Sequence, residues 1–457
     1  MAERLVGYQF ALDLNRAQTE AARAHMGARR FAQNRMLDLV KSNLSQREAE
    51  RSYGISPGQL TPSVNWSAFA LQKQWNTHKD LWAPWWQENS KEAYADGCRR
   101  LAVALSNWDR ARRGTRKGRS GFPKFASRRG RQSVTFTTGA IRIDDRRHVV
   151  LPRLGKLRTF EDTTRLSTLV DTSQARISRA TLSFHRGRWF VSFTVHERVE
   201  PPTYQHRPAM SVGIDLGVKD LFVVAGADGQ ELERVQAPRH YAEAQRRLRA
   251  LQRKAARQLG PWDPASNRHR DPSSGWRHTQ KRIVRVHARV ANLRENALHQ
   301  ATTRIARAYE NIVIEDLHVL GMTAGGGASK RGLNRAIRDA SFATFAKMLT
   351  YKTQWAGGTL TRAHRFFPSS KTCSGCQAVK TKLLLSERVY QCEKCGTRID
   401  RDLNAAINLA RYKAGFPAGV PGRDASGATH KTDLASAGGV ETGTCASRSV
   451  VSQETTA

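Results

Sequence analysis

At 457 residues the chain is long enough for about two to four domains, and 39% hydrophobic residues exclude a wholly disordered protein. The 76 Lys and Arg residues against 39 Asp and Glu give a formal net charge of +37, an excess that destabilises a compact monomer unless a polyanion such as nucleic acid is the working partner. No apolar run approaches the roughly 20 residues of a membrane-spanning helix, and the opening MAERLVGYQFALDLN contains acids and lacks the apolar core of a signal peptide, so we expect a cytoplasmic protein.

The first quarter of the sequence changes from a strand pattern to helical patterns. Residues 5–14 alternate as a strand does, and a helical stretch follows from about Ala17 to Lys41. Residues 44–113 also have mostly helical patterns and are rich in tryptophan. Tryptophans in such a segment most often form the core of a helical subdomain, although a few could stack on bases.

A basic, glycine-rich connector occupies residues 112–132, where Phe122 and Phe125 alternate with arginines. A solvated charge run is the ordinary interpretation, but this mixture of aromatic, Gly and Arg residues favours contact with phosphates. Strand-like segments follow, and the last two are joined by the turn sequence HRGR at 185–188. Together with the first strand they predict a small β-barrel that is divided by the helical insertion.

Residues from Ser211 onward predict two strands joined at 227–230 and then two arginine-rich helices, at about 239–259 and 274–309. The two helices would form a paired arm whose polar face carries Arg and Lys. This arm is either a solvent-exposed hairpin or a surface that holds a nucleic-acid backbone, and both interpretations are compatible with the sequence.

The remaining elements surround a cysteine-rich segment. The strand NIVIEDL leads into a glycine-rich loop and a helix from about Asn334 to Trp355, and a short helix, DLNAAINLARY, follows the cysteines. Beyond Lys413 the chain is rich in Gly, Ala, Ser and Thr without periodicity, which predicts a disordered tail at 413–457.

Four of the six cysteines form two CxxC pairs: Cys373, Cys376, Cys392 and Cys395. This spacing is typical of a zinc ribbon, in which two turns supply four thiolates to a tetrahedral ion. Four thiolates leave no position for water, so the zinc would be structural rather than catalytic. Disulfides are the weaker alternative because intracellular thiols are kept reduced.

Three acidic residues occupy positions where a lone acid is unexpected. Asp215 lies inside an apolar strand, Glu315 ends another, and Asp402 opens the short helix after the cysteines. Taken singly, Asp215 could cap a turn, Glu315 could pair with an arginine, and Asp402 could be a helix N-cap. Taken together, carboxylates from separate elements are the ligands of two divalent ions that hydrolyse a phosphodiester, and Mg²⁺ suits such oxygen ligands.

The order of strand Asp, strand-end Glu and helix-start Asp is the layout of RNase H-like nucleases. Asp220, Asp316 and Asp400 are neighbours that could compete for these roles. Asp316 is expected on the opposite strand face from Glu315, and Asp400 is one residue too early for the first turn of the helix. We therefore predict that Asp215, Glu315 and Asp402 are the catalytic metal ligands.

These segments resemble the TnpB family, insertion-sequence proteins related to the compact type V CRISPR effectors. The resemblance covers about residues 205–412, with a looser match in the first half through YQFALDLNRAQ, GFPKF and the HRGRW hairpin. The segments that carry it, in family order and spacing, are GIDLGVKDL, IVIEDL, RAIRDASFATFAKMLTYKT, FFPSSKTCSGC, CEKCG and DRDLNAAINLA.

The resemblance implies a multidomain α+β protein. The parts that we expect are a wedge-like β-barrel (1–16 and 121–205), a helical recognition insertion (17–120), an RNase H-like (RuvC) nuclease domain with the Arg-rich arm (206–370 and 399–412), an inserted zinc-ribbon target-binding segment (371–398) and the tail (413–457). By the same match, Asp215, Glu315 and Asp402 bind two Mg²⁺ ions, and the four cysteines bind one structural Zn²⁺.

The implied activity is cleavage of double-stranded DNA beside a short adjacent motif, directed by a guide RNA from the transposon end. We expect a monomer or dimer that acts in the prokaryotic cytoplasm, at the nucleoid. Three alternatives remain: a guided repressor that does not cut, a compact type V CRISPR effector, and a transposase that needs no RNA. Because all three acids are present, we favour cleavage.

Overall fold

A computed structural model of the chain describes residues 2–116, 118, 120–199, 211–265, 267–269, 272–325, 327–328, 330–384 and 386–412. The predicted tail at 413–457 lies outside the described residues. The chain divides near residue 200 into two compact units, which are described separately below. Among the described residues, every helix is too short or too polar to cross a membrane.

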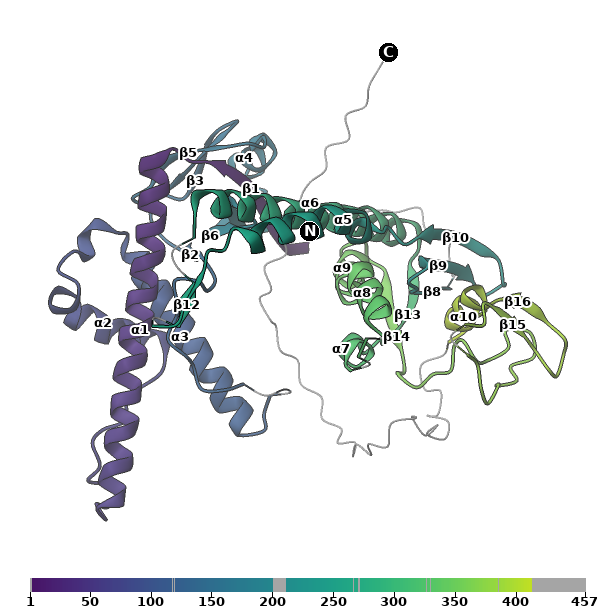
Figure 1. Ribbon diagram of the computed structural model, residues 1–457, viewed down its shortest axis with the longest axis horizontal. Coiled ribbons are helices and arrows are strands. Elements are labelled where there is room, and N and C mark those ends of the chain that lie inside the picture. Colours follow the sequence, from purple (N-terminus) through teal and green to yellow (C-terminus); the bar gives the residue numbers. More distant parts are fainter. Residues whose placement is uncertain are drawn as a thin grey trace. The chain divides into compact units, whose positions relative to one another are not determined.

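The first unit is built on a seven-stranded sheet with the order β2-β6-β7-β1-β5-β4-β3. Several of these strands are labelled in Figure 1. Its strands are β1 (Ala2–Asp13), β2 (Ser133–Phe136), β3 (Arg142–Asp145), β4 (His148–Leu151), β5 (Gly155–Thr159), β6 (Ala175–His185) and β7 (Arg188–Val199). The β6–β7 hairpin turns at Arg186 and Gly187, both with positive φ, as the HRGR sequence predicted. These pairings define a sheet, and its closure into a barrel stays a prediction.

Three helices are inserted between β1 and β2, and a fourth follows β5. They are α1 (Arg16–Ser52), α2 (Ala68–Trp82), α3 (Lys91–Arg112) and α4 (Thr164–Asp171), with the short 3-10 helix η1 (Trp86–Glu88) before α3. Two buried acids of α3 bind the edge strand: Asp96 accepts from the Thr135 amide and Glu92 from the Thr137 amide. The backbone N–H groups of an edge strand are thereby satisfied by a helix. Trp75 is buried as a core residue, whereas Trp85 is 38% exposed.

The second unit contains a five-stranded sheet with the order β10-β9-β8-β13-β14. Its strands are β8 (Ser211–Asp215), β9 (Asp220–Gly226), β10 (Glu231–Gln236), β13 (Asn311–Glu315) and β14 (Thr359–Ala363). β8 and β13 are parallel, as are β13 and β14, while β9 and β10 run antiparallel to their neighbours. Two small two-stranded pairs lie outside this sheet, β11 (Trp262–Asp263) with β12 (Arg268–His269) and β15 (Val389–Gln391) with β16 (Arg398–Asp400).

Helices cover both faces of this sheet. Side chains of α6 (Ser274–Ala308) and α9 (Phe342–Trp355) share one buried cluster with the strands, including Ile305, Phe345 and Ile314. On the other face α10 (Arg401–Ala410) packs against the strands through Ala406, Ile407 and Leu409. The arm predicted from the arginine pattern is formed by α5 (His240–Arg257) packed on α6, and two short helices, α7 (Val319–Thr323) and α8 (Arg331–Ala340), precede α9.

Two predictions in this unit are wrong and one strand was missed, each for an identifiable reason. The two strands expected from Ser211 are three, because the chain turns after β8 and the Gly217 amide donates to the Leu221 carbonyl. The single helix expected at 334–355 is divided at Ser341, whose φ of 54° ends α8. The strand β14 was not predicted, since TLTRA is short and has no apolar run.

Candidate metal centres

Two of the three predicted catalytic acids end neighbouring parallel strands. Asp215 is the last residue of β8 and Glu315 the last residue of β13, and the strands are in register up to the pair Ile214 and Ile314. The two acids therefore follow equivalent positions at the same edge of the sheet. Asp402 lies in the first turn of α10, the helix that packs on β8.

The three carboxyl groups share one poorly solvated environment. Burial raises the pKa of Asp215 well above its ordinary value, and the negative charges of Glu315 and Asp402 raise it further. Burial also raises the pKa of Glu315, against the opposing effects of the Ser369 hydroxyl and the Arg401 charge. The pKa of Asp402 is raised by burial and by the nearby Asp400. Three buried carboxylates repel one another when they are ionised, and a bound divalent cation would offset this repulsion.

The carboxylate oxygens of the three candidate acids lie farther apart than the ligands of a single compact ion site. In the part of the chain that the structure describes, only the four cysteines form a group of three or more possible ligands within 4.8 Å of one another. Two ions held about 3.5–4 Å apart can use oxygens that are farther from each other than this. The donor set therefore fits a two-ion site in its chemistry, and metal binding by Asp215, Glu315 and Asp402 stays a prediction.

The competing acids have other partners. Asp400, not Asp402, is the N-cap of α10: its side chain accepts hydrogen bonds from the amides of Asp402 and Leu403. Capping therefore does not explain Asp402, and the notion that it is an N-cap is wrong. Asp220 forms an ion pair with Arg234, 2.9 Å away.

Asp316 also differs from its neighbour Glu315. It forms ion pairs with Arg362 and Arg365 at 3.6 and 3.5 Å. The Glu315 carboxylate instead accepts a hydrogen bond from the Ser369 hydroxyl. Burial raises the pKa of Glu315, whereas Asp316 is paired with two arginines, so the two adjacent acids lie in different environments.

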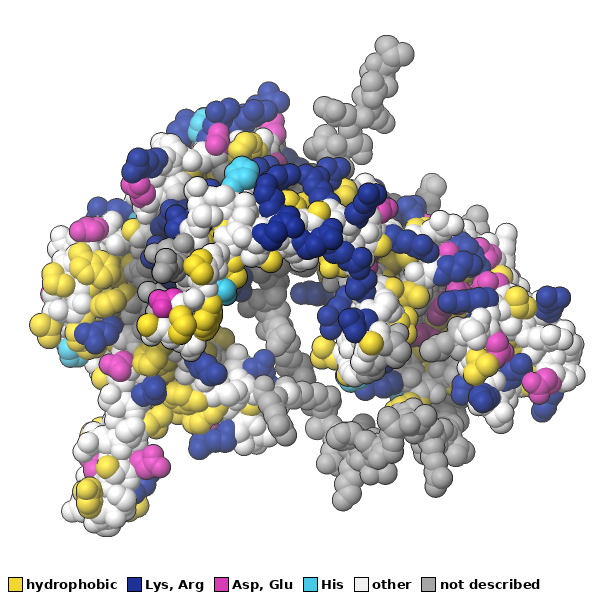
Figure 2. Space-filling model, viewed as in Figure 1, with side chains coloured by type: hydrophobic (Ala, Val, Ile, Leu, Met, Phe, Trp, Pro, Cys, Tyr) yellow, Lys and Arg dark blue, Asp and Glu magenta, His cyan; other side chains and the backbone are white. Residues whose placement is uncertain are grey.

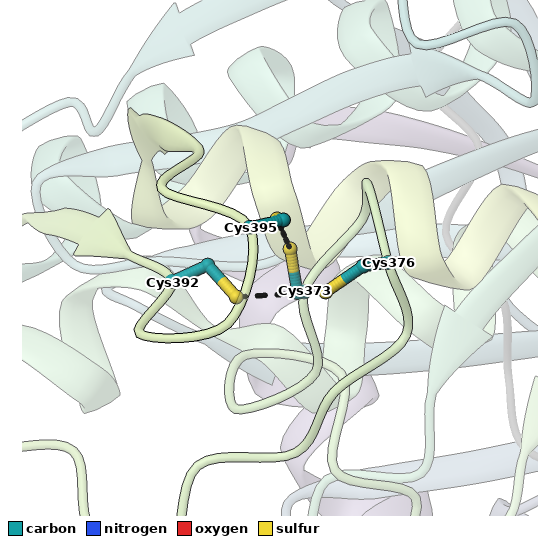
Figure 3. Close-up of side chains that lie close together, drawn as sticks. All are labelled: Cys373, Cys376, Cys392 and Cys395. Carbon is teal, nitrogen blue, oxygen red and sulfur yellow. Dashed lines mark hydrogen bonds between the residues drawn. The ribbon is translucent and has the colours of Figure 1, made fainter.

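The four cysteines converge as their spacing predicted (Figure 3). Cys373 and Cys376 lie on a turn closed by the hydrogen bond from the Cys373 amide to the Ala378 carbonyl. Cys392 and Cys395 lie on a second turn, between β15 and β16, where the Cys392 amide donates to the Thr397 carbonyl.

The sulfur positions fit a tetrahedral zinc ion. The Cys373–Cys395 and Cys376–Cys392 sulfur pairs are 3.6 and 3.5 Å apart. Zinc bound at about 2.3 Å to four sulfurs separates them by roughly 3.8 Å. Hydrogen bonds from Thr397 lower the pKa of Cys395 to about 6, which favours the thiolate that a metal requires.

Sequence reasoning did not identify several polar residues around these centres. Ser369 contacts Glu315, Arg234 contacts both Asp220 and Asp400, and two asparagines of α10 are buried. One signal for the asparagines was available, because Asn404 and Asn408 are four residues apart in the apolar run LNAAINLA and must share a helix face.

Comparisons with known proteins match nearly the whole chain. A family model of the Cas12f1-like TNB domain matches residues 342–409, and the OrfB_IS605 model, described as "Probable transposase", matches 193–324. A provisionally named RNA-guided DNA endonuclease of Mycobacterium tuberculosis (strain H37Rv) is 37% identical over 94% of this chain and 92% of its own. The similarly named InsQ of Escherichia coli K12 is 27% identical over 89% and 92%.

Solved structures give a weaker likeness. A cryo-EM structure of a Cas12f1–sgRNA–target DNA complex covers 89% of this chain and 99% of its own at 14% identity, with a TM-score of 0.33. This overlap is too low to define a shared fold. The full-length similarity to the sequence relatives carries the family assignment instead.

Proposed function

Because the chain belongs to the TnpB family of RNA-guided DNA endonucleases, we propose that it cuts double-stranded DNA beside a short adjacent motif, at sites selected by a guide RNA from its transposon end. The observation that carries the cleavage step is the placement of Asp215 and Glu315 at the ends of adjacent parallel strands, with Asp402 contributing to the same electrostatic environment. We place this activity in the prokaryotic cytoplasm, at the nucleoid.

In the proposed mechanism, Asp215, Glu315 and Asp402 hold two Mg²⁺ ions. When bound, the ions supply an activated water and stabilise the leaving oxygen of the phosphodiester. The protein holds these three side chains in place. Asp215 lies in β8, which is paired on both sides with β9 and β13. The Ser369 hydroxyl orients the Glu315 carboxylate, and the Asp400 cap fixes the helix turn that carries Asp402. A preformed site avoids the cost of ordering these ligands during the reaction.

The domain roles follow the family resemblance. We assign the unit that contains β8 to α10 to an RNase H-like (RuvC) nuclease domain, and the seven-stranded sheet with its helical insertion to a wedge and recognition module. The four cysteines would bind one structural Zn²⁺ that stiffens the target-binding segment. Support comes from the five-stranded sheet with helices on both faces and from the cysteine geometry.

Guide RNA and DNA would be held mainly through their backbones. Base pairing reads the target sequence in RNA-guided systems, so the protein needs phosphate contacts more than base contacts. A net charge of +37 supplies them. Lys and Arg side chains gather over the α5–α6 arm on the face shown in Figure 2.

The test is cleavage of motif-flanked duplex DNA by the purified complex with guide RNA and Mg²⁺. Asp215→Ala should bind guide and target normally but should cut at least about 1000-fold more slowly, since the proposed two-metal site would lose one of its three carboxylate ligands. Asp316→Ala is the matched control, because Asp316 is adjacent to Glu315 but pairs with arginines, and it should retain most cleavage.

The same experiment separates the alternatives. A wild-type complex that binds its target but never cuts would leave a guided DNA-binding protein. The match of residues 193–324 to a family described as a transposase favours a second candidate, RNA-independent action at transposon ends. That candidate predicts specific binding of DNA ends by RNA-free protein, and RNA that co-purifies with the chain argues against it.

A further inference from the structure

Two asparagines of α10 are buried where an apolar helix face would ordinarily be found. Asn404 is fully buried and Asn408 is 2% exposed. A buried amide is costly unless its hydrogen bonds are made within the protein. The partners of these two side chains therefore indicate what α10 is built to hold.

Asn404 holds the first cysteine turn. Its Nδ2 donates to the Thr372 carbonyl at 2.7 Å, and its Oδ1 accepts from the Ser374 amide at 2.9 Å. These two backbone groups are on either side of Cys373. One amide side chain thus fixes the backbone before and after a predicted zinc ligand.

Asn408 holds the segment that leads into this turn. Its Nδ2 donates to the carbonyls of Ser369 and Thr372, at 2.8 and 2.7 Å. Ser369 is itself 2% exposed, and its hydroxyl donates to a carboxylate oxygen of Glu315. Residues 369–374 therefore contact Glu315 at one end and carry Cys373 near the other.

The two centres consequently share a single buried polar network. α10 carries Asp402 in its first turn, and its next turns bind the segment that holds both Ser369 and Cys373. Because hydrogen bonds tie both the first cysteine turn and Ser369 to α10, a shift of this turn would also be expected to shift Ser369. Groups that orient metal-binding side chains in this way commonly change metal affinity when they are altered.

We propose that Ser369, Asn404 and Asn408 are positioning residues that couple the two centres, so that filling the cysteine site with zinc strengthens divalent-ion binding by the carboxylates. This rests on the proposed role of Asp215, Glu315 and Asp402 as ligands.

The test measures metal binding by the full chain without nucleic acid. Mn²⁺ serves as the probe of the carboxylate site and is followed by electron paramagnetic resonance, with Asp215→Asn defining the signal that belongs to this site. Ser369→Ala should weaken Mn²⁺ binding roughly 10- to 100-fold while the zinc content stays at one ion per chain. Ser369→Thr, which keeps the hydroxyl, should restore most of the affinity.

The cysteine side of the network is tested by zinc transfer to a chromogenic chelator. Asn404→Ala should release zinc faster than the wild type and should also weaken Mn²⁺ binding. Asn34→Ala is the matched control, because Asn34 makes the same two-bond contact to the backbone of Ala126 in the first unit. It should change neither readout.

Two results would overturn the coupling. An unchanged Mn²⁺ affinity in Ser369→Ala, or in zinc-depleted wild-type chain, would overturn the coupling alone and leave the proposed nuclease intact. Absence of any Asp215-dependent Mn²⁺ binding in the zinc-loaded wild type would overturn the coupling together with the proposed carboxylate site.

Discussion

At the scale of single residues, the proposed role of Asp215 as a metal ligand would come at a cost in stability. It is 8% exposed and its pKa is raised by burial and by Glu315 and Asp402, so its ionised form disfavours the metal-free fold. We predict that Asp215→Asn raises the midpoint temperature of unfolding of the Mg²⁺-free protein at pH 7, because the variant has no carboxylate that must ionise in this buried place.

The pH dependence of this stabilisation follows from the raised pKa of Asp215. An acid whose pKa is higher in the folded than in the unfolded chain costs stability as pH rises above the unfolded value of about 3.9. The stabilisation of Asp215→Asn relative to wild type, measured by thermal unfolding, should therefore grow from about pH 4 toward neutrality. Addition of Mg²⁺ should stabilise the wild type but not the variant. A variant less stable than wild type throughout would contradict this account.

Residue identities near the site were predictable only in part. Asp215 and Glu315 could be singled out as candidate ligands because an acid in an apolar strand is anomalous within its own segment. Ser369 could not, because its partner Glu315 is 54 residues away and a serine in a loop is unremarkable. The N-cap role fell to Asp400 rather than Asp402, a difference of two residues that local patterns do not resolve.

At the scale of elements, the contact between α10 and β8 depends on one glycine. A Cβ at Gly213 would lie 2.0 Å from the Ala406 carbonyl oxygen and 2.3 Å from the Ala410 amide nitrogen, both backbone atoms. We predict that Gly213→Ala displaces α10, lowers the free energy of unfolding by about 1–3 kcal/mol or more and reduces cleavage, because Asp402 is carried on that helix. Chemical unfolding and cleavage rates measure the two effects.

A second glycine provides the control for this prediction. Gly332 is in α8, and a Cβ there would meet no atom within 4 Å. Gly332→Ala should therefore leave cleavage unchanged and stabilise the helix by up to about 1 kcal/mol. If Gly213→Ala were equally harmless, the close approach of helix and strand would not limit the position of Asp402.

Elements with strong patterns were predicted well, and elements set by their neighbours were not. The arginine-rich helices and the β6–β7 hairpin have clear periodicity and turn residues. In contrast, β14 is stabilised by its parallel pairing with β13, and α8 and α9 are separated by a left-handed Ser341 that nothing in RAIRDASFATF requires. Tertiary context therefore decided these elements.

At the scale of the whole molecule, the charge of +37 decides which partners the protein can have. The α5–α6 arm has only a small buried core, formed by Leu248, Leu251, Ala255, Ile283 and Val286. Lys and Arg side chains gather over this arm on the face that Figure 2 shows. A hairpin with so little buried surface and so much like charge gains most from a polyanion laid along it.

Three arginines on one face of α5 should affect how strongly the affinity for RNA depends on salt. Arg246, Arg249 and Arg253 line one exposed hollow on α5, at spacings that place them on one helix face. If each contacts one phosphate, replacing all three by Gln should reduce the slope of log affinity for guide RNA against log salt by roughly 2 to 3, because each released contact contributes about 0.7–0.9. Replacing them by Lys keeps the charge and should keep the slope, while binding assays between about 50 and 200 mM salt distinguish the two variants. An unchanged slope in the Gln variant would mean that the arm faces solvent, and that the polyanion is held by other basic surfaces of the chain.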